Sequence, residues 1–455
     1  MPAAAAAPRK KPAPTKTNFA PVTAEVTRIP LDFPQRRNWW IFFVASSALL
    51  GLYVLSMVVL FWNGVGMWGV NIPVNWAMAI AMYIWWLGIG HAGTLISALL
   101  LLLGQHWRNS LNRFAEAMTL FAVVCAGMYP ILHLGRPERV FWMAPYPSTL
   151  GVWPQFRSPL AWDFFAVATY LIVSVLFWYI GAIPDFAATR DRSRTRPAQL
   201  FYGLISLGWR GASRHWLRWR QAYRLSAAIA VPLVVSVHSE ISLLLAAGPV
   251  PGWNSTVFPP YFVFGAAFSG FAVVAMIATV LRRAFALENL VTPRHLDLLG
   301  QLTLLTGMLT AYGYFAEVFS ALYGNDKADL LVLHDRLWGT YAWSYWGAWF
   351  FNFAPLQLLW IKRFRINPVW LFLISLSAAT GMWMERFMLL VTTLYRTGLV
   401  SSFHSYTPSV WEWTQYIGSI GLFMTPFLLF VRFLPMISAF EINEARDEGK
   451  TVDEA

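Results

Sequence analysis

The stretch of sequence that decides the fold is residues 115–132, AEAMTLFAVVCAGMYPIL, which leads into His133-Leu134-Gly135-Arg136-Pro137. It is an apolar run with one carboxylate, Glu116, near its start. A helix needs about 20 such residues to cross a hydrocarbon core of about 30 Å. The next apolar run opens at Ser158-Pro159-Leu160-Ala161-Trp162-Asp163. We therefore predict two consecutive membrane helices whose adjoining ends carry His133 and Asp163.

The composition of the whole chain predicts the same environment. Hydrophobic residues make up 57% and charged residues only 12% of the 455 residues, and the mean hydropathy is +0.50. These values exclude an ordinary soluble domain. The predicted fold class is an all-α polytopic membrane protein with about ten transmembrane helices, near residues 40–62, 74–103, 113–134, 159–183, 224–248, 259–281, 297–323, 338–361, 368–395 and 411–437.

The distribution of Lys and Arg predicts how these spans are oriented. If both termini lie in the cytoplasm, 27 of the 34 Lys and Arg residues fall on the cytoplasmic side and six on the other. Cytoplasmic loops carry such an excess of positive charge. The net charge of +12 therefore reflects topology and contact with anionic lipids, and a nucleic-acid partner is not expected.

Three polar segments lie outside the predicted spans. Residues 1–39 are too polar and proline-rich to pack, and we expect a cytoplasmic tail. Residues 438–455 form an acidic cytoplasmic tail, either solvated or docked on a partner. The basic connector 184–223 leads into the fifth span, and Leu200 to Arg224 alternates Trp with Arg, which indicates an amphipathic helix in the membrane interface.

Cysteine and histidine usage limits the redox groups that this chain can hold. Cys125 is the single cysteine, so a disulfide, a CxxC motif and an iron–sulfur ligand set are excluded. His91 and His238 fall at interior depths of two spans, and a bis-histidine haem between them is one alternative. We expect instead that the chain binds no haem, iron–sulfur cluster or other metal. His91 then either makes an interhelical hydrogen bond or lines a polar pathway.

Small residues recur in the second span, Gly88-Ile89-Gly90-His91-Ala92-Gly93-Thr94-Leu95-Ile96-Ser97. Small side chains let membrane helices approach closely. We interpret these glycines as packing positions.

His133 and Asp163 are the candidate catalytic residues. Ionisable side chains in a membrane are costly and usually functional. Ser158 and Pro159 explain the helix start better than Asp163 does, so capping accounts poorly for this carboxylate. His133 has a competing interpretation as an interfacial residue beside Arg136, whose side chain can reach the headgroups. Because both residues lie at the same membrane face on sequential helices, we predict that they act together, with Arg136 nearby.

Further charges lie inside other spans. Glu240 lies in the fifth span, and Glu385 and Arg386 are adjacent in the ninth. Neighbouring residues do not share a helical face, so we expect Glu385 and Arg386 to have separate partners. A buried interhelical ion pair is the alternative. Glu317 and Glu116 could extend a proton-conducting line.

Several of these motifs together resemble one family. They are Gly88 to Ser97, Arg113 to Thr119, His133 to Pro137, Ser158 to Asp163, Phe258-Pro259-Pro260-Tyr261-Phe262 and Gly381 to Phe387. As a set they resemble the NrfD/PsrC-like integral membrane subunits and, more closely, the ActC-type subunits of bacterial alternative complex III. The resemblance extends over nearly all of residues 40–437.

The resemblance implies a fold and a site. It implies two four-helix bundles, 74–248 and 259–395, flanked by one peripheral helix on each side, 40–62 and 411–437. It implies a quinol pocket at the periplasmic end of the first bundle, in a bacterial inner membrane. His133 and Asp163 match the quinol-binding pair, and Arg386 matches a family arginine. We expect Arg136, Glu240 and Arg386 to complete the quinol-binding set. The family's acidic residue is expected where this chain has Leu244, and we hypothesise that Glu240, one turn earlier, replaces it.

The implied function is quinol oxidation coupled to electron transfer. Electrons would pass to a periplasmic iron–sulfur subunit, with multihaem cytochrome subunits and a paralogous NrfD-like membrane subunit as further partners. We expect menaquinol rather than ubiquinol as the substrate, although both head groups offer the same two oxygens. Protons could cross by way of a set of titratable residues, namely His91, Glu116, His238, Glu240, Glu317 and Glu385. The alternatives are an ActF-like paralogue that moves protons or aids assembly without quinol, a secondary transporter, and a scaffold.

Overall fold

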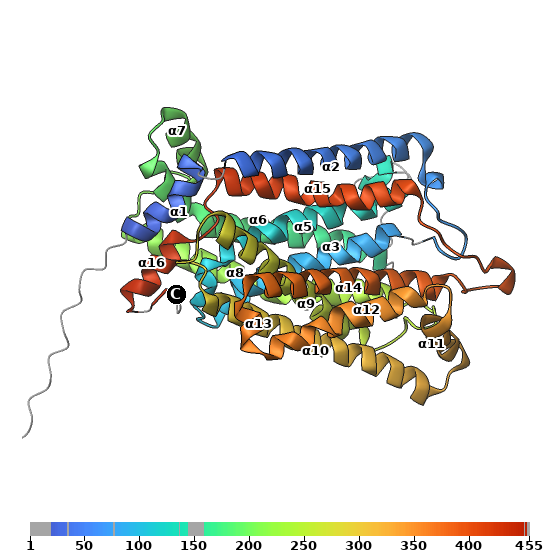
Figure 1. Cartoon of the computed structure of the whole chain (residues 1–455). Helices are drawn as coiled ribbons and strands as arrows, with labels where there is room; N and C mark the ends of the chain where they lie inside the picture. Colours follow the sequence, from blue (N-terminus) through green and yellow to red (C-terminus); the bar gives the residue numbers. More distant parts are fainter. Residues whose placement is uncertain are drawn as a thin grey trace, which may run out of the picture.

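The computed structural model describes residues 20–33, 36–75, 78–135, 137–143, 159–449 and 451–452, and these residues contain helices but no β-strand. Arg136 and Ser158, which the sequence analysis singles out, lie outside the described residues. Long helices run side by side along one axis (Figure 1). They are α2 (Arg36–Asn63), α3 (Met78–Thr94), α5 (Asn112–His133), α6 (Pro159–Arg192), α8 (Ser213–Ala246), α9 (Phe258–Ala284), α10 (Pro293–Gly324), α14 (Pro368–Leu394) and α15 (Val410–Phe433).

Shorter elements complete the described chain. The α-helices among them are α1 (Ala20–Asp32), α4 (Leu100–Leu102), α7 (Arg196–Ile205), α11 (Lys327–Trp338), α12 (Ala342–Phe353), α13 (Lys362–Ile366) and α16 (Ala439–Asp447). A π-helical turn, η2 (Leu95–Leu99), joins α3 to α4, and 3₁₀ turns form η1 (Val65–Met67), η3 (Trp107–Ser110), η4 (Pro137–Met143), η5 (Pro355–Trp360) and η6 (Val400–Ser402).

Seven helices in the described part are long and apolar enough to cross a membrane: α2, α3 with its continuation to Leu102, α5, α6, α8, α9 and α15. The predicted spans 297–323 and 368–395 correspond to α10 and α14, which are 32 and 27 residues long. The predicted span 338–361 is not one continuous helix. It divides into α12 and the turn η5, which starts at Pro355, because proline has no backbone N–H to continue the helix.

The long helices form two groups. Helices α3, α5, α6 and α8 contact one another, and α9, α10, α12 and α14 form a second contacting set. The groups meet where α9 packs on α3 and α8. A Cβ added to Gly93 would lie 2.1 Å from the carbonyl oxygen of Ala115, and one on Gly270 would lie 2.6 Å from the Cβ of Ala92. These distances confirm that small residues of the second span permit close helix packing.

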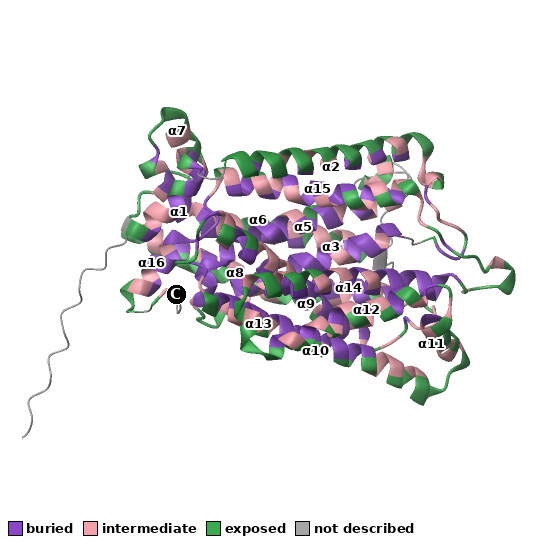
Figure 2. Ribbon diagram, in the orientation of Figure 1, coloured by how far each residue is buried: buried purple, intermediate pink, exposed green. Residues whose placement is uncertain are grey.

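The two outer helices differ from the expectation of one on each side. Helices α2 and α15 pack along each other on the same side of the molecule (Figure 1). A Cβ on Gly421 would lie 2.3 Å from the backbone nitrogen of Leu50, so the absence of a side chain at Gly421 allows this contact. The remaining surface of α2 is largely exposed, as expected for a helix that faces lipid (Figure 2).

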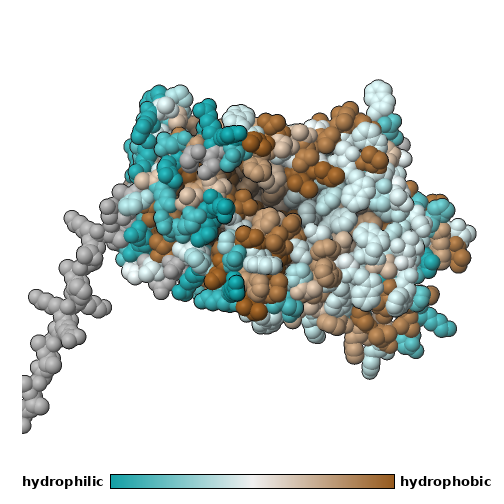
Figure 3. All heavy atoms as spheres, in the orientation of Figure 1, coloured by the Kyte–Doolittle hydropathy of each residue, from teal (hydrophilic) through white to brown (hydrophobic). Residues whose placement is uncertain are grey.

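One end of the molecule carries α1, α7, α13 and α16, and we call it the basic end; the other, which carries α11, is the opposite end (Figure 1). Hydrophilic side chains gather over the basic end in Figure 3. The amphipathic segment predicted at residues 200–224 is not a single helix. Helix α7 ends at Ile205, and α8 begins at Ser213 after a turn that contains two glycines with positive φ, Gly208 and Gly211.

Both terminal segments pack more than the sequence analysis predicts. The prediction that residues 1–39 do not pack is wrong for α1, because Val22, Val26 and Ile29 lie on one helical face and are buried. The acidic C-terminal segment is not simply solvated or held by a partner. In α16, Ile442 is fully buried and Glu441 is only 5% exposed, so this helix docks on its own chain.

Candidate functional site

Asp163 lies beyond the first turn of α6, near the opposite end, and is only 4% exposed. Its carboxylate accepts a hydrogen bond from the hydroxyl of Tyr83, which comes from α3 and is also buried. A buried tyrosine hydroxyl usually finds such a partner. Sequence reasoning missed Tyr83, and the only available signal was a polar tip within the very apolar run 78–90. The two side chains together form a polar centre between the helices of the first bundle.

Glu240 adds a second carboxylate to this centre from α8. It interacts electrostatically with both Asp163 and Tyr83. Within the described part of the chain, neither of its buried carboxylate oxygens has a hydrogen-bond partner. Leaving a buried acceptor unsatisfied is costly. The Glu240 carboxylate could therefore accept a hydrogen bond from the hydroxyl group of a bound ligand, or take up a proton.

His133 ends α5 at the same end of the bundle as Asp163 and is half-buried. Its Nε2 lies 3.1 Å from the backbone carbonyl oxygen of Asn75, in the segment that precedes α3. This contact joins the end of α5 to the segment that precedes α3. Arg136, the predicted neighbour, lies outside the described residues.

His91 and His238 meet in the interior of the first bundle, with ring centroids 4.2 Å apart. His91 Nδ1 lies 2.7 Å from the carbonyl oxygen of Leu87, and Nε2 lies 2.9 Å from that of Val234. Rings in direct contact leave no room for a porphyrin, and His91 has no nitrogen left for iron. The residues do not fit the bis-histidine haem alternative. The contact of His91 with Val234 is an interhelical hydrogen bond, one of the two roles expected for this residue.

His238 is the more unusual member of this pair. It is fully buried, and both of its ring nitrogens lack a partner among the described residues. Its ring lies 6.1 Å from that of Phe262 on α9, so it faces the second bundle. Among the residues that the structure describes, no three His, Cys, Asp or Glu side chains are arranged to hold a metal ion.

The second bundle contains its own polar centre. Tyr261 on α9 donates a hydrogen bond to the Glu385 carboxylate on α14. The prediction of separate partners for Glu385 and Arg386 is only partly right. Each residue has its own partner on α9, but Arg386 Nη1 also lies 3.1 Å from Glu385 Oε1. Neighbouring residues of a helix project in different directions, but both of these side chains are long enough to reach each other. The Arg386 guanidinium also stacks 4.3 Å from the ring of Phe262.

Glu317 on α10 is also engaged. It forms an ion pair of 2.6 Å with Arg336 on α11, and Arg336 in turn contacts the hydroxyl of Thr393. The pair lines a cavity of about 190 Å³ at the opposite end. The sequence does not single out Arg336, because residues 324–337 lie between two predicted spans and are expected to form a loop.

Glu116 lies at the basic end, in a buried charge cluster rather than beside Asp163. Its carboxylate contacts Arg113 at 3.1 Å and accepts a hydrogen bond from Tyr223 at 3.2 Å. Arg113 also pairs with Asp185 on α6 at 3.3 Å and with Glu441 on α16 at 3.3 Å. Sequence reasoning missed this cluster, since Arg113 and Glu441 are 328 residues apart in the chain.

Comparison with known proteins finds one matching family model and several similar subunits of reductases or oxidoreductases. The family model described as "Polysulphide reductase, NrfD" matches residues 67–397. A selenate reductase subunit of Mesobacillus selenatarsenatis is 22% identical over 88% of this chain and 94% of that protein. A putative dimethyl sulfoxide reductase membrane subunit of Halobacterium salinarum is 23% identical over 77% of this chain and 78% of that protein. The Hdr-like menaquinol oxidoreductase integral membrane subunit of Archaeoglobus fulgidus is 26% identical over 50% of this chain and 61% of that protein.

Proposed function

Because the chain belongs to the NrfD polysulphide reductase family, whose model matches residues 67–397, we propose that it is the quinol-binding membrane subunit of a respiratory oxidoreductase. The relatives are named as subunits of reductases or oxidoreductases, two of them as membrane subunits, and one name includes menaquinol. The polar centre formed by Tyr83, Asp163 and Glu240 lies in the first bundle, near the opposite end of the molecule. Quinol oxidation is the activity that its side chains best support.

The observation that carries the proposal is the buried Tyr83–Asp163 hydrogen bond, with the unpartnered Glu240 carboxylate within electrostatic range of both residues. A quinol presents two hydroxyl groups, and its oxidation to quinone releases two protons and two electrons. Asp163 is placed to accept one hydroxyl proton, and Tyr83 positions that carboxylate. Glu240 supplies a further acceptor. His133 at the end of α5 is the proposed second base.

The two electrons released by quinol oxidation pass to a partner subunit. We propose that the acceptor is an iron–sulfur subunit on the periplasmic side and that menaquinol is the quinol used. Alternative complex III, with multihaem cytochromes and a paralogous membrane subunit, is the assembly that the ActC-like motifs favour. In this arrangement the opposite end faces the periplasm, and the basic end with both termini faces the cytoplasm.

Proton movement without quinol chemistry is a second candidate. It is favoured by the buried polar side chains that continue from the first bundle into the second, from His91 and His238 to Glu385 and Arg386. Ionisable residues at membrane depth mark proton relays in many transport proteins. An ActF-like role would use this line and leave Asp163 dispensable.

The two candidates are separated by measuring quinol-dependent reduction of a high-potential acceptor by the purified complex. We expect Asp163→Asn to lower kcat by about 100-fold or more, because general-base catalysis contributes about 10²–10⁴-fold. The matched control is Asp191→Asn, which makes the same chemical change at the exposed basic end of α6. We expect the control to keep full activity.

All samples must contain equal amounts of this subunit and of iron–sulfur cluster, so that lost assembly is not mistaken for lost catalysis. Full turnover of the Asp163→Asn complex would overturn the quinol proposal and favour the second candidate. A Glu240→Gln complex with full activity and unchanged proton release would remove Glu240 from the site while leaving Asp163 in place.

A further inference from the structure

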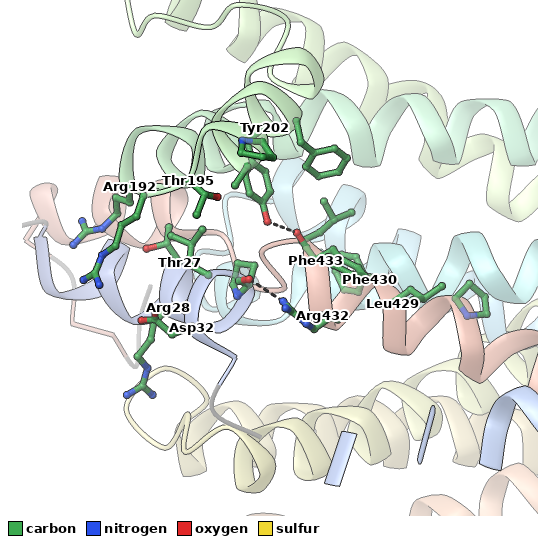
Figure 4. Close-up of a pocket in the computed structure, with 18 of the residues that line it drawn as sticks. Thr27, Arg28, Asp32, Arg192, Thr195, Tyr202, Leu429, Phe430, Arg432 and Phe433 are labelled. Carbon is green, nitrogen blue, oxygen red and sulfur yellow. Dashed lines mark hydrogen bonds between the residues drawn. The ribbon is translucent and has the colours of Figure 1, made fainter. Parts of the chain in front are cut away.

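A large cavity lies at the basic end, between α1, α6, α7 and α15, far from the Asp163 centre (Figure 4). Its volume is about 1270 Å³. Pockets for drug-sized ligands span roughly 300–1,000 Å³. A single inorganic anion would therefore leave most of this space empty. We expect a larger ligand whose shape and chemistry match the whole cavity.

Positive charge outweighs negative charge in the lining of the cavity. Four arginines, Arg28, Arg192, Arg194 and Arg432, line it together with a single carboxylate, Asp32. Arg192 and Arg194 are exposed and have no ion pair within the part of the chain that the structure describes. Figure 4 shows Arg28 and Arg192 on the same side of the cavity. This end suits an anionic group.

The other end of the cavity is apolar. It is lined by Phe121, Trp178, Leu429 and Phe430, and Figure 4 places the last two away from Arg28 and Arg192. Trp178 and Arg192 are 14 residues apart on the same helix, α6, which corresponds to about 21 Å along its axis. The cavity thus extends from the arginines along α6 into the apolar part of this helix.

Hydrogen bonds between elements hold the cavity in shape. Tyr202 on α7 donates to the carbonyl oxygen of Phe433 on α15 at 2.7 Å. Arg432 on α15 donates to the carbonyl oxygen of Pro30 on α1 at 3.0 Å. Both bonds appear in Figure 4. Because three separate elements are tied together around it, the cavity is preformed and needs little ordering to accept a ligand.

We propose that this cavity binds one anionic phospholipid, with its phosphate beside Arg28, Arg192 and Arg194 and an acyl chain along Trp178 and Phe430. A charged head joined to a long apolar chain matches both ends of the cavity at once. Basic pockets between transmembrane helices recruit anionic headgroups in this way. The acyl chain gains free energy by covering the apolar lining.

The test uses native mass spectrometry of the full-length protein after delipidation, with dioleoylphosphatidylglycerol and zwitterionic dioleoylphosphatidylcholine as probes. The test variant is Arg192→Gln/Arg194→Gln. The matched control is Arg214→Gln/Arg218→Gln, which removes the same charge from exposed positions of α8 outside the cavity. All four positions are exposed, so neither variant should prevent folding.

We expect one tightly bound phosphatidylglycerol in the wild-type and control proteins, with at least tenfold preference over phosphatidylcholine, and loss of that preference in the test variant. Equal binding of both lipids by the wild type would overturn the proposal, as would equal loss in both variants. Soluble glycerol phosphate tests the other source of a phosphate group. If it displaces the bound lipid at equal concentration, the apolar end contributes nothing and the lipid assignment is wrong.

Discussion

Arg113 shows how one side chain can connect several helices. Its guanidinium pairs with Glu116, Asp185 and Glu441, which lie on α5, α6 and α16, and donates to the carbonyl oxygen of Gly181 at 2.6 Å. Burying a charge costs several kcal/mol unless partners satisfy it, and removing one partner from such a set is strongly destabilising. The stability of the cluster therefore depends on each of its charged side chains and on sufficient space for the Arg113 guanidinium.

The space for this guanidinium is provided by Gly181. A Cβ at that position would lie 2.3 Å from Arg113 Nη1. We predict that Gly181→Ala lowers the free energy of unfolding by about 3 kcal/mol, because it displaces a buried charge from its partners. The measurement is thermal unfolding of the purified protein in detergent.

Gly51→Ala is the control, since nothing lies within 4 Å of a Cβ at this helical position of α2. We expect it to be neutral or slightly stabilising, because alanine favours helix over glycine. Equal unfolding temperatures for the two variants would contradict the role given to Gly181.

Sequence patterns reveal a charged residue in a membrane helix but not its partner. His133, Asp163, Glu240 and Arg386 stand out because charges are rare in apolar runs. Tyr83 does not stand out, because its role depends on how α3 is rotated against α6. That rotation is set by tertiary packing between helices, and a single sequence does not specify it.

At the scale of elements, a buried carboxylate makes several of the contacts that hold α16. Glu441 contacts Arg108 and Asn112 as well as Arg113, and Ser438 caps the helix. Burial raises the pKa of the Glu441 carboxyl, but the guanidinium groups of Arg108 and Arg113 outweigh burial and lower this pKa below its ordinary value. Docking of α16 is therefore linked to ionisation of Glu441.

This linkage predicts how docking depends on pH. Because the pKa of Glu441 is lowered on folding, its stabilisation is complete above the ordinary glutamate pKa and is lost as the pH falls through the folded-state pKa. We expect α16 to resist limited proteolysis from neutral pH down to the ordinary glutamate pKa of about 4.5 and to be released as the pH falls further, through the lower folded-state pKa. A Glu441→Gln variant should release α16 already at neutral pH.

Glu448→Gln serves as the control, because Glu448 is exposed and its ion pair with His106 is long, at 4.0 Å. We expect its cleavage to follow the wild type. Protection of α16 in the Glu441→Gln variant at neutral pH would contradict the proposed clamp.

Long apolar elements are predicted well, whereas short amphipathic ones are not. Each of α2, α5, α6, α8 and α9 follows a continuous hydrophobic run that a bilayer requires. Helices α1 and α16 carry much less apolar sequence, and they form because a few residues such as Val26 and Ile442 find a surface to cover. Tertiary contacts of this kind leave little trace in local sequence.

At the scale of the whole molecule, the two ends differ in chemistry. The basic end carries the Arg113 cluster and the cavity lined by Arg28 and Arg192, whereas the opposite end carries the Asp163 centre. Since positive residues favour the cytoplasmic side, we propose that the opposite end faces the periplasm. That orientation would give the protons of the proposed quinol oxidation a direct exit to the periplasmic side.

Variants with one added cysteine test this orientation. Cys125, the one native cysteine, is buried, so a membrane-impermeant maleimide should not label it. We predict that Ser401→Cys, exposed at the opposite end, is labelled in right-side-out vesicles. Ser213→Cys, exposed at the basic end, should be labelled only after the vesicles are opened. The reverse pattern would contradict the proposed orientation.

The most direct test of the central claim is to locate a quinol analogue in the assembled complex by electron cryomicroscopy. We predict density for its ring in the first bundle at the opposite end, with one oxygen beside the Asp163 carboxylate and Tyr83, and loss of that density in the Asp163→Asn complex. Density only in the cavity beside Glu317 and Arg336, or only at the basic end, would contradict the account.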